Sequence, residues 1–457
     1  SDVYKRQARR DRPGDFGRYL DFMRAQVREL CTGYGPLACM WWDGAWDHEK
    51  TPAGRAALGE INDLVRGLQP DILINNRAAN PADFETPEQY IPPTGICGRD
   101  GSPKLWENCV TLTAGKGSFA PHAWWGYDAC ETEFKTPEFC IRMLADVASK
   151  GGNLLLNVGP TPEGRIRPEE RRVLEAVGRW LEVHGQAIYG TTAGPFEYLP
   201  FFGRATVRDD VLYLIVFQWP ADAVLEVPGL QNEVRAARLL GEERAELRVE
   251  RDGDVTRVRL PARAPDPAAS VVALELDGRP RVAPVTIRPG RDGTVVLDAA
   301  AAQIRGGFGQ KARLETDAAG VLIGSWTRDR DYATWNFEMP LAGVCEVFVE
   351  HAGAAAGAVL EVGVSRAAAG GAGSAPAMVD ATSGGHAFEI PPPVSVLRVE
   401  ISAQTAVAGR HALGRIEVPA GRLILAVRPV GLPDGQALMG LRRVELRGVP
   451  ASGGAGG

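Results

Sequence analysis

The chain has 457 residues, more than a single hydrophobic core usually holds, so the sequence predicts two to four domains. Its formal net charge is −6 and 24% of its residues are charged, with no long run of one sign, which argues against a nucleic-acid-binding surface. No apolar stretch approaches the ~20 residues that cross a bilayer, and the 7 cysteines form no CxxC pair, so neither a membrane span nor a disulfide framework is predicted.

The first residues carry no targeting signal. The opening SDVYKRQARRDRPG has no initiator methionine and no apolar signal-peptide core. An amphipathic helix is predicted directly after it, at about residues 17–32, with Tyr19, Met23 and Val27 on one face. We expect the chain to be an N-terminally truncated fragment in which any localisation signal has been lost.

Helices and strands alternate between residues 15 and about 196. Three helices are predicted where proline takes the first helical position, directly after Thr51, Thr136 and Arg167. Short apolar runs such as Leu154–Leu156 lie between helices and are predicted strands. This α/β alternation predicts a parallel sheet, and its length predicts only the C-terminal half of a (β/α) TIM-like barrel, because a full barrel needs ~250 residues. We assign residues 1–197 to this partial barrel.

The pattern changes at about residue 199 to short alternating strands separated by Gly, Pro and Asp turns. Residues 198–279 are predicted to form an antiparallel β-sandwich, and residues 285–449 a second, jelly-roll-like β-sandwich that is all-β. Trp326, Tyr332 and Trp335 lie close together in the sequence of the second sandwich. They are either a platform that stacks on a sugar or core residues whose side chains alternate along a strand.

Asp43 follows a run of small and apolar residues, as a functional carboxylate does at the end of a buried parallel strand. Trp41, Trp42 and Trp46 surround it in sequence and offer flat faces for a sugar ring. Arg77 ends the next strand, so we expect it beside Asp43 on the same rim, where its charge keeps a nucleophilic carboxylate ionised. The alternatives are an ordinary turn aspartate and a rim salt bridge that contacts no ligand.

A second carboxylate follows in the segment DFETPEQY. Two carboxylates among aromatic residues are the minimum for cleaving a glycosidic bond, and one of them acts as general acid. Glu88 and Glu85 compete for this role by position. Thr86–Pro87 also resembles a helix start, in which case Glu88 would only stabilise a helix N-terminus. Glu107 is either catalytic or a structural hydrogen-bond acceptor.

No cofactor or metal is predicted. The sequence has no Walker motif, no dinucleotide-binding glycine pattern and no GxSxG elbow. His48 and His122 are the only histidines of this segment that could reach the rim, and no third ligand accompanies them.

Seven motifs occur in order between about Tyr19 and Phe196: YGPLACMWWDG, LINNR, DFETPEQYIP, LWENCVTL, WWGY, SKGGNLLLNVGPTPEGRI and GQAIYGT. Together they closely resemble the α-L-fucosidases of glycoside hydrolase family 29. The sandwich that follows, up to Asp277, resembles the C-terminal β-domain of that family. Each motif alone is a weak signal, whereas the ordered set is highly specific.

The resemblance implies retaining hydrolysis of terminal α-L-fucose from glycans through a covalent fucosyl-enzyme. Asp43 matches the nucleophile of the family, and Glu88 matches the acid/base of the subgroup with the DFxT-x-E pattern. Arg77 aligns with an arginine that contacts fucose, Trp41 with an aromatic residue of the same pocket, and Trp125 with the aromatic residue near the C6 methyl group. A retaining pair implies carboxyl groups about 5–5.5 Å apart.

Other features depart from the family or leave alternatives open. The histidines with which the family holds the sugar hydroxyls precede the nucleophile strand, and none of them is found here. We therefore expect this chain to be poorly soluble or inactive, although its parent gene product is a fucosidase. The alternatives are a non-catalytic carbohydrate-binding scaffold and a retaining hydrolase of α-L-galactosides. Fucosylated glycans as partners, and a periplasmic or secreted location, follow from the resemblance alone, and the sequence leaves the oligomeric state open.

Overall fold

The computed structural model describes residues 15–44, 51–78, 82–98, 102–116, 118, 123–196, 199–242, 246–283, 285–306, 310–367 and 391–449. The chain divides into two compact parts. Among the described residues, the first part holds residues 15–86 and Lys104–Glu107, and the second part holds Pro87–Pro103 and the residues from Asn108 onward.

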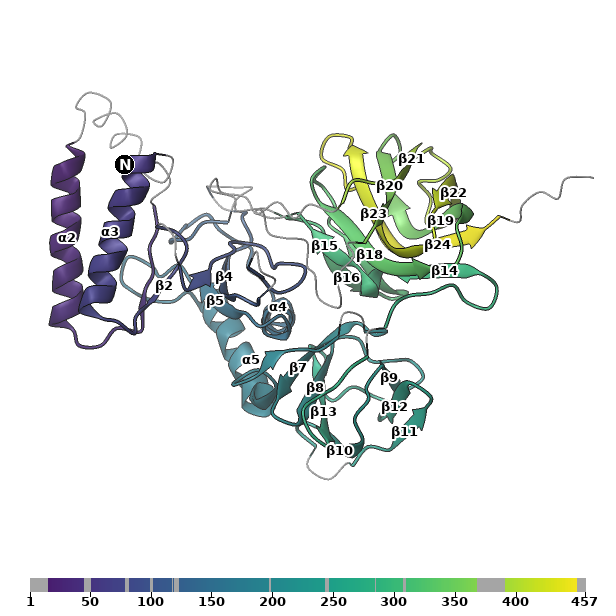
Figure 1. Cartoon of the computed structure of the whole chain (residues 1–457), viewed down its shortest axis with the longest axis horizontal. Coiled ribbons are helices and arrows are strands. Elements are labelled where there is room, and N and C mark those ends of the chain that lie inside the picture. Colours follow the sequence, from purple (N-terminus) through teal and green to yellow (C-terminus); the bar gives the residue numbers. More distant parts are fainter. Residues whose placement is uncertain are drawn as a thin grey trace, which may run out of the picture. The chain divides into compact units, whose positions relative to one another are not determined.

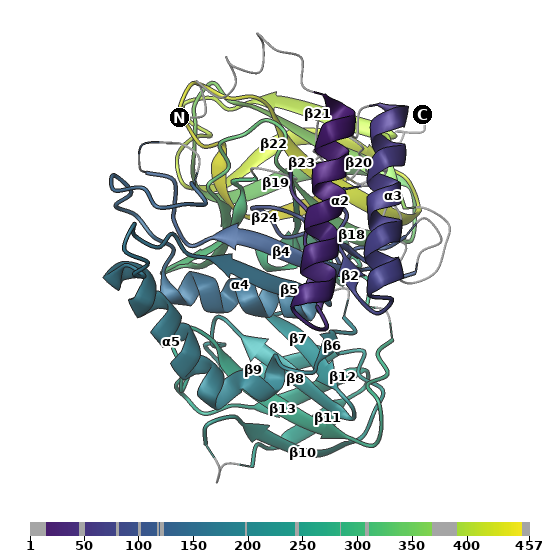
Figure 2. The same ribbon diagram turned by 90° about the vertical axis from the view of Figure 1, so that its left-hand side faces the viewer.

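Two helices form most of the first part. α2 (Phe16–Gly33) begins after Asp15, whose side chain accepts a hydrogen bond from the main chain of Arg18. α3 (Pro52–Leu68) begins after Thr51, which caps it in the same way, and proline takes its first position. The two helices lie side by side (Figures 1 and 2).

Three very short strands complete the first part. β1 (Cys39–Met40) pairs in parallel with β2 (Leu73–Ile74), and β3 (Phe84–Glu85) pairs in parallel with the beginning of β4 (Leu105–Thr111). The core joins the inner faces of both helices to β1 and β2, through Val27, Cys31, Met40, Ile61, Val65, Ile72 and Ile74. The strand ends β1 and β2 are therefore anchored at one edge, from which the chain continues to Asp43 and Arg77.

The second part begins with α/β elements and continues with β-sheets. α4 (Pro137–Ser149) and α5 (Pro168–His184) begin at prolines, as predicted, and β5 (Asn153–Asn157) lies between them in the sequence. A five-stranded sheet has the order β10-β13-β8-β7-β6, and a three-stranded sheet has the order β11-β12-β9. Their strands are β6 (Thr192–Ala193), β7 (Gly203–Arg208), β8 (Val211–Val216), β9 (Val224–Pro228), β10 (Val234–Leu239), β11 (Val249–Asp252), β12 (Val255–Arg259) and β13 (Ser270–Leu276).

Two larger antiparallel sheets follow, with orders β16-β17-β24-β19-β22, where β14 also pairs with β24, and β15-β18-β23-β20-β21. Residues of both sheets belong to one hydrophobic core, so the sheets form two layers (Figure 1). Their strands are β14 (Thr294–Asp298), β15 (Gln303–Arg305), β16 (Arg313–Asp317), β17 (Gly320–Gly324), β18 (Tyr332–Met339), β19 (Gly343–Ala354), β20 (Val359–Arg366), β21 (Ser395–Glu400), β22 (Gly409–Val418), β23 (Gly421–Gly431) and β24 (Met439–Gly448).

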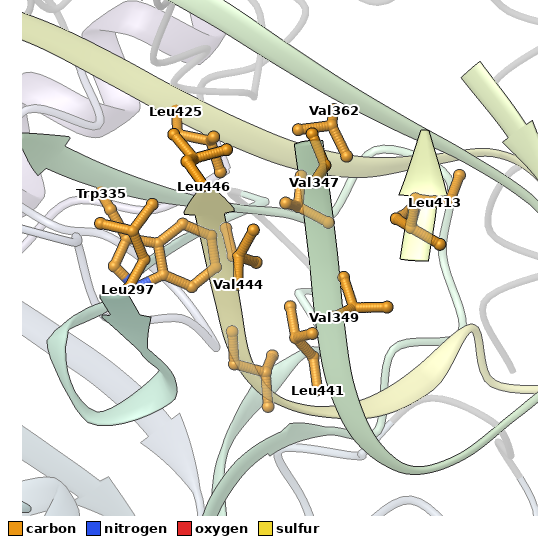
Figure 3. Close-up of a cluster of buried hydrophobic side chains, with 14 of the residues drawn as sticks. Leu297, Trp335, Val347, Val349, Val362, Leu413, Leu425, Leu441, Val444 and Leu446 are labelled. Carbon is orange, nitrogen blue, oxygen red and sulfur yellow. The ribbon is translucent and has the colours of Figure 1, made fainter. Parts of the chain in front are cut away.

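Two of the three aromatic residues considered as a sugar platform are core residues. Trp326 is 0% exposed and Trp335 is 1% exposed, so neither ring offers a face to a ligand. Their indole N–H groups donate to the main-chain oxygens of Asp331 and Asp298, at 2.6 and 2.8 Å. Figure 3 shows Trp335 inside the core formed by the two sheets. Tyr332 is half-buried. The two tryptophans pack in the hydrophobic core, so they cannot form the sugar platform that was considered as one alternative.

The structure is a mixed α/β chain with many sheet strands, and no closed barrel occurs among the described residues. β17 ends at Gly324, and the chain turns at Ser325, which has a positive φ of 53°. Over the described residues, no helix combines the length and apolar character needed to span a bilayer.

Candidate active site

Asp43 and Arg77 leave the sheet at the same edge. Because β1 and β2 are parallel neighbours, the residues that follow them emerge side by side. The Arg77 Nη1 atom lies 3.1 Å from the Asp43 Oδ1 atom. The Asp43 side chain is 56% exposed and that of Arg77 is 15% exposed, so the carboxylate is open to a ligand while the guanidinium is held in place. The predicted neighbourhood of these two residues is confirmed.

A buried asparagine fixes the exit from β1. Asn75 is 0% exposed, accepts a hydrogen bond from the Trp42 main-chain nitrogen at 2.8 Å and donates to the Trp42 carbonyl at 3.0 Å. The Trp42 indole nitrogen donates to Asn62 of α3 at 2.8 Å. These bonds fix the main chain on one side of Asp43, which limits the directions its carboxylate can take.

Arg77 lies between an aromatic ring and a threonine. Its guanidinium carbon lies 4.7 Å from the centre of the Trp41 ring, within cation–π distance. Its Nε atom donates to the Thr86 hydroxyl at 2.9 Å. The Trp41 indole in turn donates to Glu107 Oε1 at 2.9 Å. Glu107 is thus a hydrogen-bond acceptor that orients Trp41, one of its two predicted roles.

Glu85 is held inside the first part. It is 6% exposed, its Oε1 atom lies 2.7 Å from Lys104 Nζ, and its Oε2 atom accepts a hydrogen bond from Asn76. Asn76 also accepts from the Thr86 hydroxyl at 2.8 Å. A carboxylate that is buried and paired in this way supports the loop, so of the two glutamates Glu88 is the better candidate for proton transfer.

Glu88 belongs to a strand-like segment of the second part. It forms a parallel bridge with Cys109 of β4, and among the described residues around it no helix begins at Pro87. The interpretation of Thr86–Pro87 as a helix start is therefore wrong, because the main chain here pairs with β4 instead. The Glu88 side chain is half-buried, and its Oε1 atom accepts a hydrogen bond from the Trp125 indole at 3.1 Å.

The loop that carries Trp125 is fixed by close main-chain contacts. Asn157, at the end of β5, donates to the Trp125 carbonyl at 2.7 Å. A Cβ atom on Gly159 would lie 2.6 Å from the Gly126 carbonyl oxygen, so only glycine permits this approach. The asparagine and the glycine of the NLLLNVG motif thus place Trp125 against Glu88. The sequence predicts only a strand at Leu154–Leu156 and gives no sign of this role.

The predicted site residues fall into two groups, one in each part of the chain. Asp43, Arg77 and Trp41 come together in the first part, and Glu88 and Trp125 come together in the second. Trp46, His48 and His122 lie outside the described residues. Within the described ranges, no group of three or more His, Cys, Asp or Glu side chains could hold a metal ion.

Residues 1–186 match the family model described as Alpha-L-fucosidase. This segment is therefore similar to α-L-fucosidases. A curated relative, the α-L-fucosidase of Branchiostoma floridae, is 35% identical over 210 residues, which cover 43% of this chain and 42% of that enzyme. The chain thus spans less than half the length of this curated relative.

Solved structures of the family are also similar. The α-L-fucosidase isoenzyme 1 from Paenibacillus thiaminolyticus is 35% identical with a TM-score of 0.52, covering 58% of this chain and 64% of that one. The GH29 α-L-fucosidase from Bacteroides thetaiotaomicron, trapped as a covalent intermediate with 2-fluoro-fucosyl fluoride, is 26% identical with a TM-score of 0.50, covering 57% and 61%. The match to the family model covers the segment that contains Asp43 and Arg77.

Proposed function

We propose that this chain carries the catalytic residues of a retaining exo-glycosidase that releases terminal α-L-fucose from glycans. The observation that carries the proposal is the cluster of Asp43, Arg77 and Trp41 at the ends of adjacent parallel strands, in the segment that matches the fucosidase family. An open carboxylate, a fixed cation and an aromatic face suit a nucleophile that must meet a sugar ring.

In the proposed reaction an Asp43 oxygen attacks the anomeric carbon while Glu88 gives its proton to the glycosidic oxygen. The bond between the anomeric carbon and this oxygen breaks, the aglycone leaves as an alcohol, and fucose becomes bonded to Asp43 as an ester. Glu88 then accepts a proton from water, whose oxygen attacks the same carbon and releases fucose and the Asp43 carboxylate. Water is the only co-reactant.

Separate contacts around each carboxyl group support these proposed roles. Arg77, which contacts Asp43, also donates to Thr86, and Glu88 follows Thr86 by two residues along the chain. Glu88 in turn accepts from Trp125, which the family resemblance assigns to the wall near the C6 methyl group. An apolar wall rejects an added hydroxyl group by a factor on the order of 100, so α-L-galactosides should be poor substrates.

The finer architecture is part of the proposal. We assign residues 1–197 to the C-terminal part of a (β/α) barrel, which the parallel pairs β1–β2 and β3–β4 support. We assign residues 198–279 to a β-sandwich and residues 285–449 to a jelly-roll-like sandwich, which the two layers around one core support. A periplasmic or secreted location would suit an enzyme that acts on glycans.

The test is hydrolysis of 4-nitrophenyl α-L-fucoside by the longest natural polypeptide that contains this sequence, with the α-L-galactoside as comparison. Asp43→Ala should abolish turnover, whereas Asp71→Ala, which removes an exposed aspartate just before β2, should not. Azide should restore turnover to Asp43→Gly and yield a fucosyl azide, because a small anion replaces the missing nucleophile. Full activity in Asp43→Ala, or faster cleavage of the galactoside, would overturn the proposal.

A further inference from the structure

Gln89, the residue after Glu88, has a strained main chain. Its φ is 60°, in the left-handed region that side chains other than glycine, asparagine and aspartate rarely adopt. Such a conformation costs about 1–3 kcal/mol and persists only where the surroundings enforce it. The strain lies beside the proposed acid/base, so the contacts that enforce it also bear on Glu88.

The main chain around Glu88 makes one step of a parallel ladder and then leaves it. The Cys109 N–H donates to the Pro87 carbonyl at 3.1 Å, and the Gln89 N–H donates to the Cys109 carbonyl at 2.9 Å. In a continuing parallel strand the next step would pair the Thr111 N–H with the main-chain carbonyl of Gln89. The left-handed turn at Gln89 takes this carbonyl out of the ladder.

The Gln89 side chain takes the place of the missing step. Its Oε1 atom accepts a hydrogen bond from the Thr111 main-chain nitrogen at 3.4 Å, and its Nε2 atom donates to the Thr111 hydroxyl at 3.1 Å. Thr111 is 0% exposed, so its N–H has no access to water. A buried donor without a partner costs about 1–3 kcal/mol, comparable to the strain at Gln89. The Gln89 side-chain amide therefore satisfies the main-chain N–H at the end of β4 and stabilises the turn that follows Glu88.

A second amide supports the same segment from β4. Asn108 is 0% exposed, and its side-chain nitrogen donates to the carbonyl of Tyr90 and, at 3.4 Å, to that of Pro87. The main chain is therefore held before and after Glu88, while the Glu88 carboxylate itself extends to the Trp125 indole. A change at Gln89 would alter the direction of Glu88 without removing any group that meets substrate.

We propose that Gln89 is a positioning residue for Glu88: its side-chain amide replaces a main-chain step of the sheet and so aims the acid/base carboxyl group. This inference rests on the proposed function, because it assigns Glu88 the proton transfer. General acid catalysis contributes about 100- to 10,000-fold and is needed most for poor leaving groups. A misaimed Glu88 should therefore slow cleavage selectively where the leaving alcohol needs a proton.

The kinetic test compares fucosides that differ only in their leaving group. Gln89→Leu keeps much of the side-chain bulk but loses both hydrogen bonds to Thr111. It should lower kcat/KM about 10- to 100-fold for phenyl α-L-fucoside and less than about threefold for 2,4-dinitrophenyl α-L-fucoside. Asn232→Ala is the matched control, since this buried amide joins Asp277 and Arg281 far along the chain. It should leave the ratio of the two rates unchanged. An equal loss on both substrates in Gln89→Leu would overturn the inference.

A second measurement does not depend on turnover. The indole ¹⁵N–¹H resonance of Trp125, assigned by its loss in Trp125→Phe, reports the hydrogen bond to Glu88. Gln89→Leu and Glu88→Gln should both shift it, and Asn232→Ala should not. If Gln89→Leu fails to fold, Gln89→Gly, which adopts the left-handed turn without strain, takes its place. An unshifted resonance would overturn the inference, whereas absent turnover in the unaltered protein with a shifted resonance would count against the proposed function alone.

Discussion

The first part of the chain and the two large C-terminal sheets are built in different ways. β1, β2 and β3 are 2 residues each, and their positions depend on hydrogen bonds such as those between Asn75 and the main chain of Trp42. β19 and β23, by contrast, are 12 and 11 residues long and bury alternate side chains in one large core. In the first part, hydrogen bonds orient the polar side chains of the site. In the C-terminal sheets, the strands bury apolar side chains in a core.

This difference predicts different responses to substitution. In the C-terminal sheets, the loss of a buried side chain should lower the free energy of unfolding and leave the site chemistry unchanged. In the first part and around Glu88, substitutions should change rates more than stability, because the groups are partly exposed and their role is directional.

The largest effect is expected from Trp335→Ala. This side chain is 1% exposed and also donates to the Asp298 carbonyl, so its loss should lower the free energy of unfolding by about 3–5 kcal/mol. Urea unfolding measures the change. At temperatures where the variant is folded, fucoside turnover should equal that of the unaltered protein, and a selective loss of turnover would contradict the division of roles.

Arg77→Met should lower kcat/KM for the fucoside about 100-fold, because Asp43 loses the group that aims it. The unfolding free energy should change by less than about 1 kcal/mol, since the ion pair is partly exposed. Arg24→Met is the control, because Arg24 pairs with Glu60 across α2 and α3, away from Asp43. If both substitutions lowered turnover equally, the contact between Arg77 and Asp43 would not explain the loss.

Trp125→Phe keeps an aromatic ring but removes the indole N–H that Glu88 accepts. We expect kcat/KM to fall about tenfold, which corresponds to ~1.4 kcal/mol, the size of one hydrogen bond. Trp124→Phe alters the preceding, more exposed ring and should have little effect. A larger loss of kcat/KM in Trp124→Phe than in Trp125→Phe would contradict the assignment of this role to Trp125.

The smallest effect concerns pH and the C-terminal sheets. Burial, and then the neighbouring His411 ring, lower the pKa of His351, whose Nδ1 atom accepts a hydrogen bond from Gly353 as a neutral ring. Below about pH 6.5 the unfolded chain binds a proton that the folded chain resists, so the free energy of unfolding falls as pH drops. Urea unfolding at pH 7 and 5.5 should show a weaker decrease in His351→Gln. An equal decrease in the free energy of unfolding in His351→Gln and in the unaltered protein would exclude His351 as a source of this pH dependence.

Local signals predicted the helices and the first half of the site. Proline after Thr51, Thr136 and Arg167 marked three helix starts, and parallel neighbours placed Arg77 beside Asp43. The sequence left Glu85 and Glu88 open as the proposed acid/base, and the contact of the buried Glu85 with Lys104, 19 residues later, favours Glu88.

Long-range contacts were beyond sequence reasoning. Gln89 and Thr111 are 22 residues apart, and no local pattern shows that a side chain completes a sheet step. β22 is hard to recognise in the sequence because its glycines, Gly409 and Gly414, weaken the strand pattern; both adopt positive φ angles within the sheet. The burial of Trp326 and Trp335 follows from two sheets that share a core, and their clustering in sequence does not reveal it.

Trapping with 2-fluoro-fucosyl fluoride is the most direct test of Asp43 as the nucleophile, because the fluorine slows release of the sugar from the nucleophile. We expect a covalent fucosyl adduct on the peptide that contains Asp43, detected by mass spectrometry, and no adduct in Asp43→Asn. An adduct on another carboxylate, or a folded and active protein that never forms one, would contradict it.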